Sequence, residues 1–236
     1  RVLEILWKRI ETEIGQEILT EKGWLEEELE FHELFIAGLT RRFVGRRDVL
    51  DRMHDFLEHD AKNPILVVTG EPGCGKSALM ARFSEEAKHR HPDWLIIPHF
   101  VGASPDSTII RQVLRRVCMH MYNACDFDKQ MQERISQITG NDEQAQEQRK
   151  IIQKEYTIPD DYKELAEKFP EFLRKASMSH RVLMILDAAN QLDKSDDAHA
   201  MRWLPQPMPE NVSFLISTLA GEVYDALTAQ RTKPEV

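Results

Sequence analysis

Cysteine, glycine and long apolar runs are all scarce in this sequence. Its 236 residues include 3 cysteines and 10 glycines, and aromatic residues make up 8%. Three cysteines cannot form a paired disulfide framework, which favours a reducing, intracellular location, with the cytoplasm as the first expectation. The apolar runs, such as residues 65–68 and 182–186, are too short to cross a bilayer, and no signal peptide pattern opens the sequence. We therefore expect neither a membrane-spanning segment nor a disulfide scaffold.

Basic residues are also fewer than acidic residues. Lysine and arginine total 31 against 40 aspartate and glutamate residues, which gives a net charge of −9 at pH 7. This balance argues against a protein that coats nucleic acid or anionic lipid, but it leaves room for a local phosphate pocket. With 42% hydrophobic residues the chain can bury a core, so we expect one large α/β domain with a flanking piece. The sequence starts at Arg1 rather than at methionine, and we expect a segment of a longer protein.

Residues 1–40 have the apolar spacing of helices. Apolar side chains recur three and four positions apart on both sides of Gly23, and the acidic run within residues 26–33 is expected to line the solvated face. The simpler interpretation is a helical flank that packs on its neighbour, and the alternative is a helix that binds a partner. The repeating side chains are Leu3, Trp7, Ile10, Ile14 and Ile18, followed by Leu25, Leu29, His32 and Ile36.

From residue 64 onward the pattern changes to short apolar runs separated by helical stretches. Strands that are apolar on both faces and alternate with helices are typical of a parallel sheet covered on both sides. We therefore predict a three-layer α/β fold with a mostly parallel sheet, preceded by the helical flank. The segment at residues 139–150 has Ala145 as its only apolar side chain, so we expect an exposed helix or insertion outside the core. The predicted strands cover residues 65–69, 94–101, 182–186 and 212–217, and the predicted helices cover residues 76–89 and 108–122.

A phosphate-binding motif occupies residues 70–77, which read GEPGCGKS and fit G-x-x-x-x-G-K-[ST] without a mismatch. Its glycines let the backbone turn tightly, so that successive N–H groups can surround a phosphate at the start of the next helix. Lys76 supplies a cation for the β- and γ-phosphates, and Ser77 offers a hydroxyl to Mg²⁺. We predict a nucleotide site here, in which Cys74 fills a variable position of the loop.

A carboxylate for the metal follows the third predicted strand. Asp187 ends the apolar run at residues 182–186, where it can hold Mg²⁺ through water, although a helix-capping role is the alternative. The next polar residues, Asn190 and Gln191, cannot usefully accept a proton, and Asp193 is the nearest carboxylate that could act as a base. Binding is thus better supported than rapid turnover.

Two hydroxyl groups end the last predicted strand. The side chains of Ser217 and Thr218 would either contact the γ-phosphate or the attacking water, or satisfy backbone groups at the strand end. The residues alone leave both roles open.

Two further groups of polar side chains have simple explanations. Cys118, His120 and Cys125 lack an evident fourth ligand for zinc, so buried thiols are the better interpretation. Three arginines in the helix at residues 108–122 are predicted to line its solvated side, and a trans-acting arginine finger is the alternative. These are Arg111, Arg115 and Arg116.

Five segments taken together are similar to a known family. In chain order they read FVGRRDVL, ILVVTGEPGCGKSALMARF, HFVGASPDST, VLMILDAANQLD and RWLPQPMPENVSFLISTLAG. They resemble the signal-transduction ATPases with numerous domains (STAND) and, among these, the NACHT-like group of nephrocystin, telomerase-associated and WD-repeat proteins. The resemblance extends over residues 41–236, which we expect to form the P-loop NTPase core, with residues 1–40 as the flank.

The resemblance implies roles for particular residues. The V-G-R segment would wrap the adenine, Walker A and Walker B would supply the phosphate and metal contacts, and sensor 1 would lie at the end of the last strand. We expect Lys76, Asp187 and Asp193 to serve catalysis, and Ser77 and Asp187 to hold Mg²⁺. The residues expected to contact ATP or ADP are Val44, Gly45, Arg46, Gly70, Glu71, Pro72, Gly73, Cys74, Gly75, Lys76, Ser77, Ala78, Ser217 and Thr218.

The resemblance also implies a regulatory switch. Typical members continue into a last core strand, a helical lid and a repeat array, none of which we recognise in this sequence, and they open on a signal and oligomerise. We therefore expect an ATP/ADP-binding switch module that needs Mg²⁺ and hydrolyses slowly at most, with protein partners and self-association through other regions. The rivals are an ordinary ATPase that uses Asp193 or a partner's group as base, and an interaction module with structural nucleotide. A nucleoside kinase is more distant, since no acceptor pocket or lid arginines are evident.

Overall fold

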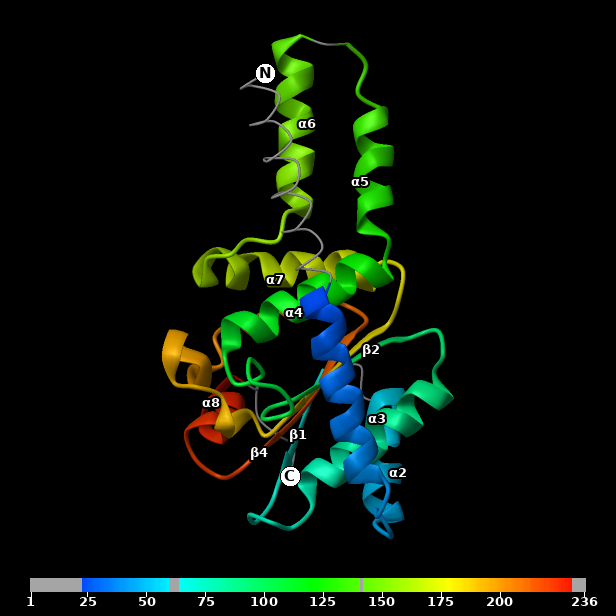
Figure 1. The fold of residues 1–236 in the computed structure, drawn as a ribbon, viewed down its shortest axis with the longest axis vertical. Coiled ribbons are helices and arrows are strands. Elements are labelled where there is room, and N and C mark those ends of the chain that lie inside the picture. The colour runs from blue at the N-terminus through cyan, green and yellow to red at the C-terminus, as the bar shows by residue number, and fades with distance from the viewer. Residues whose placement is uncertain (1–22, 60–63, 141, 231–236) are drawn as a thin grey trace, which may run out of the picture.

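The computed structural model describes residues 23–59, 64–140 and 142–230 (Figure 1). The expected helix before Gly23 therefore lies outside the described residues. Within the described part, no helix is long and apolar enough to cross a membrane. After a helix over residues 23–40, the elements are α2 (Arg47–His59), β1 (Ile65–Thr69), α3 (Lys76–Arg90), β2 (Leu95–Phe100), α4 (Ile110–Ala124), α5 (Phe127–Ser136), α6 (Glu143–Tyr156), α7 (Tyr162–Ser177), β3 (Val182–Asp187), η1 (Ala189–Gln191), η2 (Ser195–Ala200), β4 (Val212–Thr218) and α8 (Glu222–Gln230).

The four strands form one parallel sheet in the order β1-β4-β3-β2. Each predicted strand is present within a residue or two of its expected limits, and the α/β fold class is confirmed. The sheet is parallel because each strand is followed by a helical crossover that returns the chain to the same end. Its register pairs Thr69 with Thr218 and Leu186 with Ile216, so the carboxyl ends of β1, β3 and β4 lie side by side.

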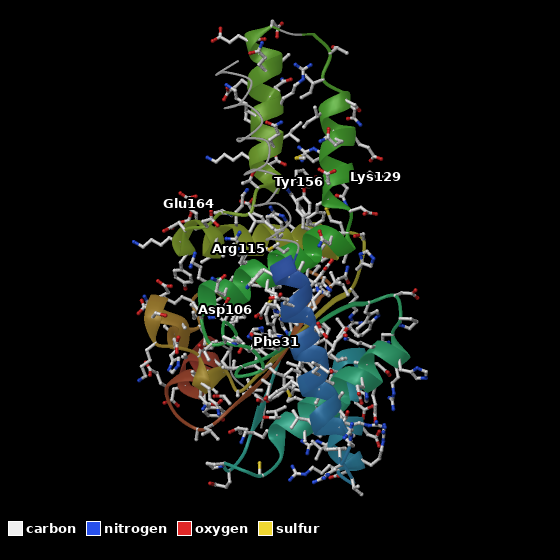
Figure 2. The ribbon with its side chains drawn as sticks, in the orientation of Figure 1. Phe31, Asp106, Arg115, Lys129, Tyr156 and Glu164 are labelled. Atoms are coloured by element: carbon white, nitrogen blue, oxygen red, sulfur yellow. The ribbon has the colours of Figure 1, made fainter. Side chains whose placement is uncertain are left out.

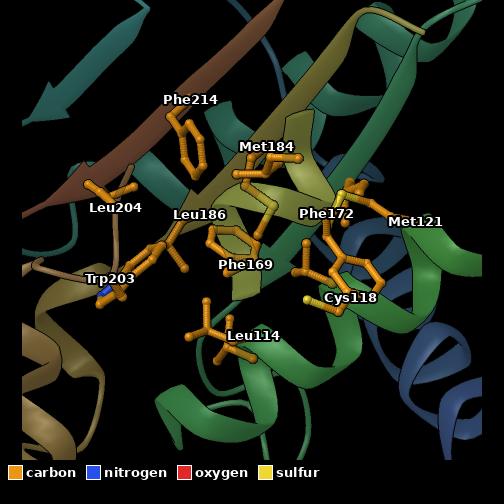
Figure 3. Close-up of a cluster of buried hydrophobic side chains, with 14 of the residues drawn as sticks. Leu114, Cys118, Met121, Phe169, Phe172, Met184, Leu186, Trp203, Leu204 and Phe214 are labelled. Atoms are coloured by element: carbon orange, nitrogen blue, oxygen red, sulfur yellow. The ribbon is translucent and has the colours of Figure 1, made fainter. Parts of the chain in front are cut away.

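Alternate residues of the sheet enter two different cores. In β3, Leu183 and Ile185 pack with α2 and α3, whereas Met184 and Leu186 pack with α4 and α7. This alternation is the expected result of a strand that projects successive side chains to opposite faces. Figure 3 shows the second core, in which Phe169 of α7 lies among these strand residues. The sheet is thus a rigid middle layer with apolar side chains on both faces.

Helices α5 and α6 form a hairpin that projects away from the sheet (Figure 1). Tyr156 lies at its base (Figure 2). It packs edge-on against Phe127, and the ammonium group of Lys175 lies 3.7 Å from the centre of its ring. The polar segment expected to be exposed and outside the core includes the first part of α6. Its single apolar residue, Ala145, belongs to neither core cluster, as expected, but at 4% exposure it is buried rather than exposed.

The helix over residues 23–40 is fixed to the domain by buried polar side chains. Glu28 is 4% exposed and accepts a hydrogen bond from Ser104 Oγ at 2.8 Å. The expectation that Glu28 faces solvent is therefore wrong, because it lies on the same helix face as Leu25 and His32, both buried. The helix thus carries a carboxylate into the domain.

A buried arginine lies beneath that helix. Arg116 is 1% exposed, and its guanidinium donates to the carbonyl of Pro98 at 2.8 Å and to His99 Nδ1 at 3.0 Å. Its expected place on a solvated helix side is wrong, since it falls on the apolar stripe of α4 between Val113 and Val117. Burial lowers the pKa of Arg116 to about 10, and the negative charge of the neighbouring Glu28 partly offsets this.

The same cluster holds two histidines in the neutral form. Burial, and then the charge of Arg116, lower the pKa of His32 to about 3 and hold the pKa of His99 well below its ordinary value. The geometry agrees, because His99 Nε2 donates to the Ser107 carbonyl at 2.8 Å while Nδ1 accepts from Arg116. A proton on His99 Nδ1 would place one N–H donor against the N–H donor of Arg116, with no acceptor between them.

We predict that acid weakens the fold through these histidines. An unfolded histidine takes up a proton below about pH 6.5 and these two do not when folded, so stability is present above that pH and is lost as the pH falls. The pKa of Glu28 is raised by burial and acts in the opposite direction, but only near the ordinary range of carboxylates. These two histidines should together lower the free energy of unfolding in urea by about 2 kcal/mol between pH 7.5 and pH 5.5. Burial also lowers the pKa of His54, His91 and His120, so these histidines add to the fall.

A glutamine at residue 99 separates this effect from general acid sensitivity. His99→Gln can keep the acceptor for Arg116 and the donor for Ser107 but cannot titrate, so the loss of stability between pH 7.5 and pH 5.5 should be about 1 kcal/mol smaller than in the wild type. His89→Gln alters an exposed side chain in the last turn of α3 and should leave the dependence unchanged. Equal pH dependence in the wild type and His99→Gln would contradict this assignment.

Candidate functional site

The candidate site lies at the carboxyl ends of the parallel strands. Thr69 and Thr218 are paired neighbours at the ends of β1 and β4, so the loop that starts at Gly70 emerges beside the loop that starts at Leu219. Asp187 ends β3, the strand on the other side of β4. Crevices at this edge of an open parallel sheet are where ligands bind in α/β proteins.

The phosphate-binding loop has the backbone that its sequence predicts. Gly73 and Gly75 have φ angles of 73° and 88°, a left-handed conformation that side chains oppose. Gly75 is also the N-cap of α3, where no side chain accepts a hydrogen bond from the helix and no acidic residue occupies the first turn. The N-terminal amides of a 15-residue helix therefore keep their partial positive charge available to an anion.

Lys76 is folded back over this loop. Its Nζ donates to the carbonyl oxygens of Gly70 at 2.8 Å and Glu71 at 3.0 Å, and it lies 3.9 Å from Cys74 Sγ. The ammonium group thus spans the loop at the place where an anion would be held. Ser77 and Ala78 follow in the first turn of α3 and are half-buried, while Glu71 and Pro72 are exposed.

The segment at residues 44–46 is joined to the loop directly. Arg46 has a φ angle of 55°, next to Gly45 at 87°, and this turn begins α2. The Arg46 guanidinium donates to the carbonyl oxygen of Cys74. Val44 is 89% exposed, so an apolar side chain stands open to solvent beside the turn. The structure therefore brings two expected parts of the site together.

Asp187 is held by a hydroxyl from the neighbouring strand. Ser217 Oγ donates to Asp187 Oδ1 at 2.5 Å and accepts from the backbone N–H of Ala188 at 2.8 Å. All three groups are at or near the sheet edge, and Asp187 and Ser217 are almost fully buried. Asp187 Oδ2 remains an oxygen of the type that coordinates Mg²⁺ or its water, so the donor set fits this ion together with Ser77.

The turn after Asp187 has an unusual backbone. Ala188 adopts φ 55° and ψ 44°, a left-handed conformation that costs a non-glycine residue about 1 kcal/mol or more. This turn directs the Ala188 N–H to Ser217 and starts the short helix η1. The sequence contains no glycine or asparagine at residue 188 to signal it.

Hydrogen bonds also hold two further polar residues of this loop in place. Asn190 Oδ1 accepts from the backbone N–H of Leu219 at 3.1 Å, which fastens η1 to the end of β4. Asp193 is exposed, and its carboxylate accepts from Thr108 Oγ1 at 3.2 Å while its N–H donates to the Thr108 carbonyl at 2.9 Å. The candidate base is therefore held against the start of α4.

The two hydroxyls at the end of β4 have different partners. Ser217 contacts Asp187, as described above, whereas Thr218 Oγ1 donates to the Leu219 carbonyl at 3.1 Å. Elsewhere, the thiols of Cys118 and Cys125 are buried, and the described residues contain no group of three or more metal-ligating side chains. Burial raises the pKa of both thiols.

The site has the three features that define a P-loop NTPase domain. A glycine-rich loop lies between a strand and an uncapped helix, a lysine is folded over this loop, and a buried carboxylate lies at the end of a neighbouring strand. The chain belongs to the AAA ATPase domain family, whose profile matches residues 42–216. It is a nucleotide-binding NTPase module of the NACHT-like type.

Similar curated proteins support this assignment. Human nephrocystin-3 is 26% identical over 74% of this chain, and human NACHT domain- and WD repeat-containing protein 1 is 25% identical over 92%. A TPR repeat-containing protein of Dictyostelium discoideum is 23% identical over 89%. The alignments cover 11%, 12% and 15% of the lengths of these proteins, so the chain corresponds to a small part of each.

We predict that Ser217→Ala destabilises the fold. The change leaves Asp187 Oδ1 and the Ala188 N–H without their buried partner, which should lower the free energy of unfolding by about 1–3 kcal/mol. The change in the free energy of unfolding is measured by urea unfolding at pH 7.5. Ser213→Ala, on the same strand at 9% exposure, is the matched control and should cost less. Equal losses in the two variants would show that the bond to Asp187 adds nothing.

Proposed function

We propose that this chain is the ATP/ADP-binding switch module of a multidomain signalling or scaffold protein, and that it binds nucleotide with Mg²⁺. The observation that carries the proposal is the uncapped N-terminus of α3 under the folded Lys76. Backbone amides and one lysine would hold the β- and γ-phosphates there. The loop residues that would line the phosphates are Gly70, Glu71, Pro72, Gly73, Cys74, Gly75, Lys76, Ser77 and Ala78.

The segment before α2 would bind the base. Val44 offers an open apolar side chain, and Arg46 joins the turn at Gly45 to the phosphate loop through the Cys74 carbonyl. An adenine packed on this segment would therefore be connected to the phosphate contacts. Mg²⁺ would be held by Ser77 and Asp187, with Ser217 keeping the carboxylate in place.

Slow hydrolysis would follow from the residues that come after Asp187. Asn190 and Gln191 bear amides, which do not accept a proton at neutral pH, and Asp193 is bound to Thr108. A nucleotide that persists can bias two conformations through contacts that differ between ATP and ADP. The names of the relatives include WD and TPR repeats, and on this basis we propose protein partners and self-association through regions beyond this domain.

We predict that Lys76→Ala weakens nucleotide binding. Titration calorimetry with ATP, ADP and GTP should show binding of both adenine nucleotides to the wild type. Loss of the ammonium group should lower the affinity for ATP and ADP by about 10- to 100-fold, which corresponds to the free energy of a hydrogen bond between charged groups. Lys88→Ala removes an exposed lysine at the far end of α3 and should bind like the wild type.

Three results would contradict parts of this proposal. A wild-type chain that binds no nucleotide excludes the nucleotide switch. Equal affinity for GTP and ATP contradicts the adenine role of residues 44–46. Steady-state turnover at about 1 per second or faster, lost in Asp193→Ala, would support the ordinary ATPase instead.

A further inference from the structure

The hydroxyls at the end of β4 have no proton to give to a phosphate. A hydroxyl carries one proton, and Ser217 donates its proton to Asp187 while Thr218 donates to the Leu219 carbonyl. Ser217 and Thr218 are also both fully buried. A sensor of the γ-phosphate at this edge must therefore be another group.

Asn190 has the donors that the hydroxyls lack. Its Oδ1 accepts from the Leu219 N–H at 3.1 Å, and this bond fixes which side of the carboxamide is oxygen and which is nitrogen. The Nδ2 group then keeps two N–H bonds to donate. The side chain is half-buried, so it remains reachable from the site.

The position of Asn190 is set by the sheet register. Thr69 pairs with Thr218, so Leu219 and Gly70 start neighbouring loops from strands about 4.8 Å apart. Asn190 is fastened to Leu219 and therefore lies at the edge from which the phosphate loop emerges. The left-handed turn at Ala188 and the short helix η1 bring it there from β3.

Resting on the nucleotide site proposed above, we propose that Asn190 is the residue that distinguishes ATP from ADP. Its amide donates to an oxygen of the γ-phosphate, a contact that ADP cannot make. Because an amide does not take up a proton at neutral pH, Asn190 holds the phosphate without activating water. The same side chain thus favours the ATP state and leaves hydrolysis slow.

Asn190→Asp tests this role with little change of shape. The carboxylate still accepts from the Leu219 N–H, so the loop should stay folded and the melting temperature should change little. It replaces two N–H donors by a negative charge next to the γ-phosphate. In calorimetry with Mg²⁺, affinity for a non-hydrolysable ATP analogue should fall about 10- to 100-fold, and affinity for ADP should change by less than about threefold.

Gln191→Glu is the control for charge. It adds the same negative charge one residue further on, at an exposed side chain, and should leave both affinities unchanged. A purely structural role for Asn190 predicts an unchanged ratio of the two affinities in Asn190→Asp, and that result would overturn the proposal, as would tighter binding of the ATP analogue. Wild-type chain that binds neither nucleotide would instead contradict the proposed function as a whole.

Discussion

The parallel pairing of β1, β4 and β3 is the constraint on which the site depends. It places Thr69, Thr218 and Asp187 at one edge, from which the phosphate loop, the loop after β4 and the buried carboxylate all emerge. An antiparallel neighbour would carry its loop to the opposite end of the sheet. The two apolar cores on either face hold this arrangement in place, and hydrogen bonds such as that of Ser217 to Asp187 orient the polar groups at the edge.

This edge explains how an acidic chain can bind a polyanion. The chain as a whole carries a net charge of −9, whereas the site provides backbone amides at an uncapped helix and the ammonium group of Lys76. Such short-range donors act within the first turn of the helix, and distant charges are screened by salt. The acidic side chain of Asp187 does not oppose this binding, since a carboxylate oxygen is a donor suited to a divalent cation.

Local patterns were enough to predict the fold class, the four strands, the helices α3 and α4, and the phosphate loop. The strands are short apolar runs and the loop is a contiguous motif, so each could be recognised within about ten residues. The contacts that position the site were not predictable in this way. Ser217 meets Asp187 across 30 residues, and Glu28 meets Ser104 across 76. Glu28 and Arg116 were assigned to solvent because their charges suggested it, while their helix faces placed them inside.

Hydrogen exchange followed by mass spectrometry with saturating ADP and Mg²⁺ tests the central claim most directly. The account predicts slower exchange within the segment at residues 70–79 and at residues 45–46, because the N–H groups at the start of α3 would be bonded to phosphate and those of residues 45–46 covered by adenine. The α5–α6 hairpin should be unaffected. Nucleotide that binds while the amides of residues 70–79 exchange as fast as in its absence would contradict the account.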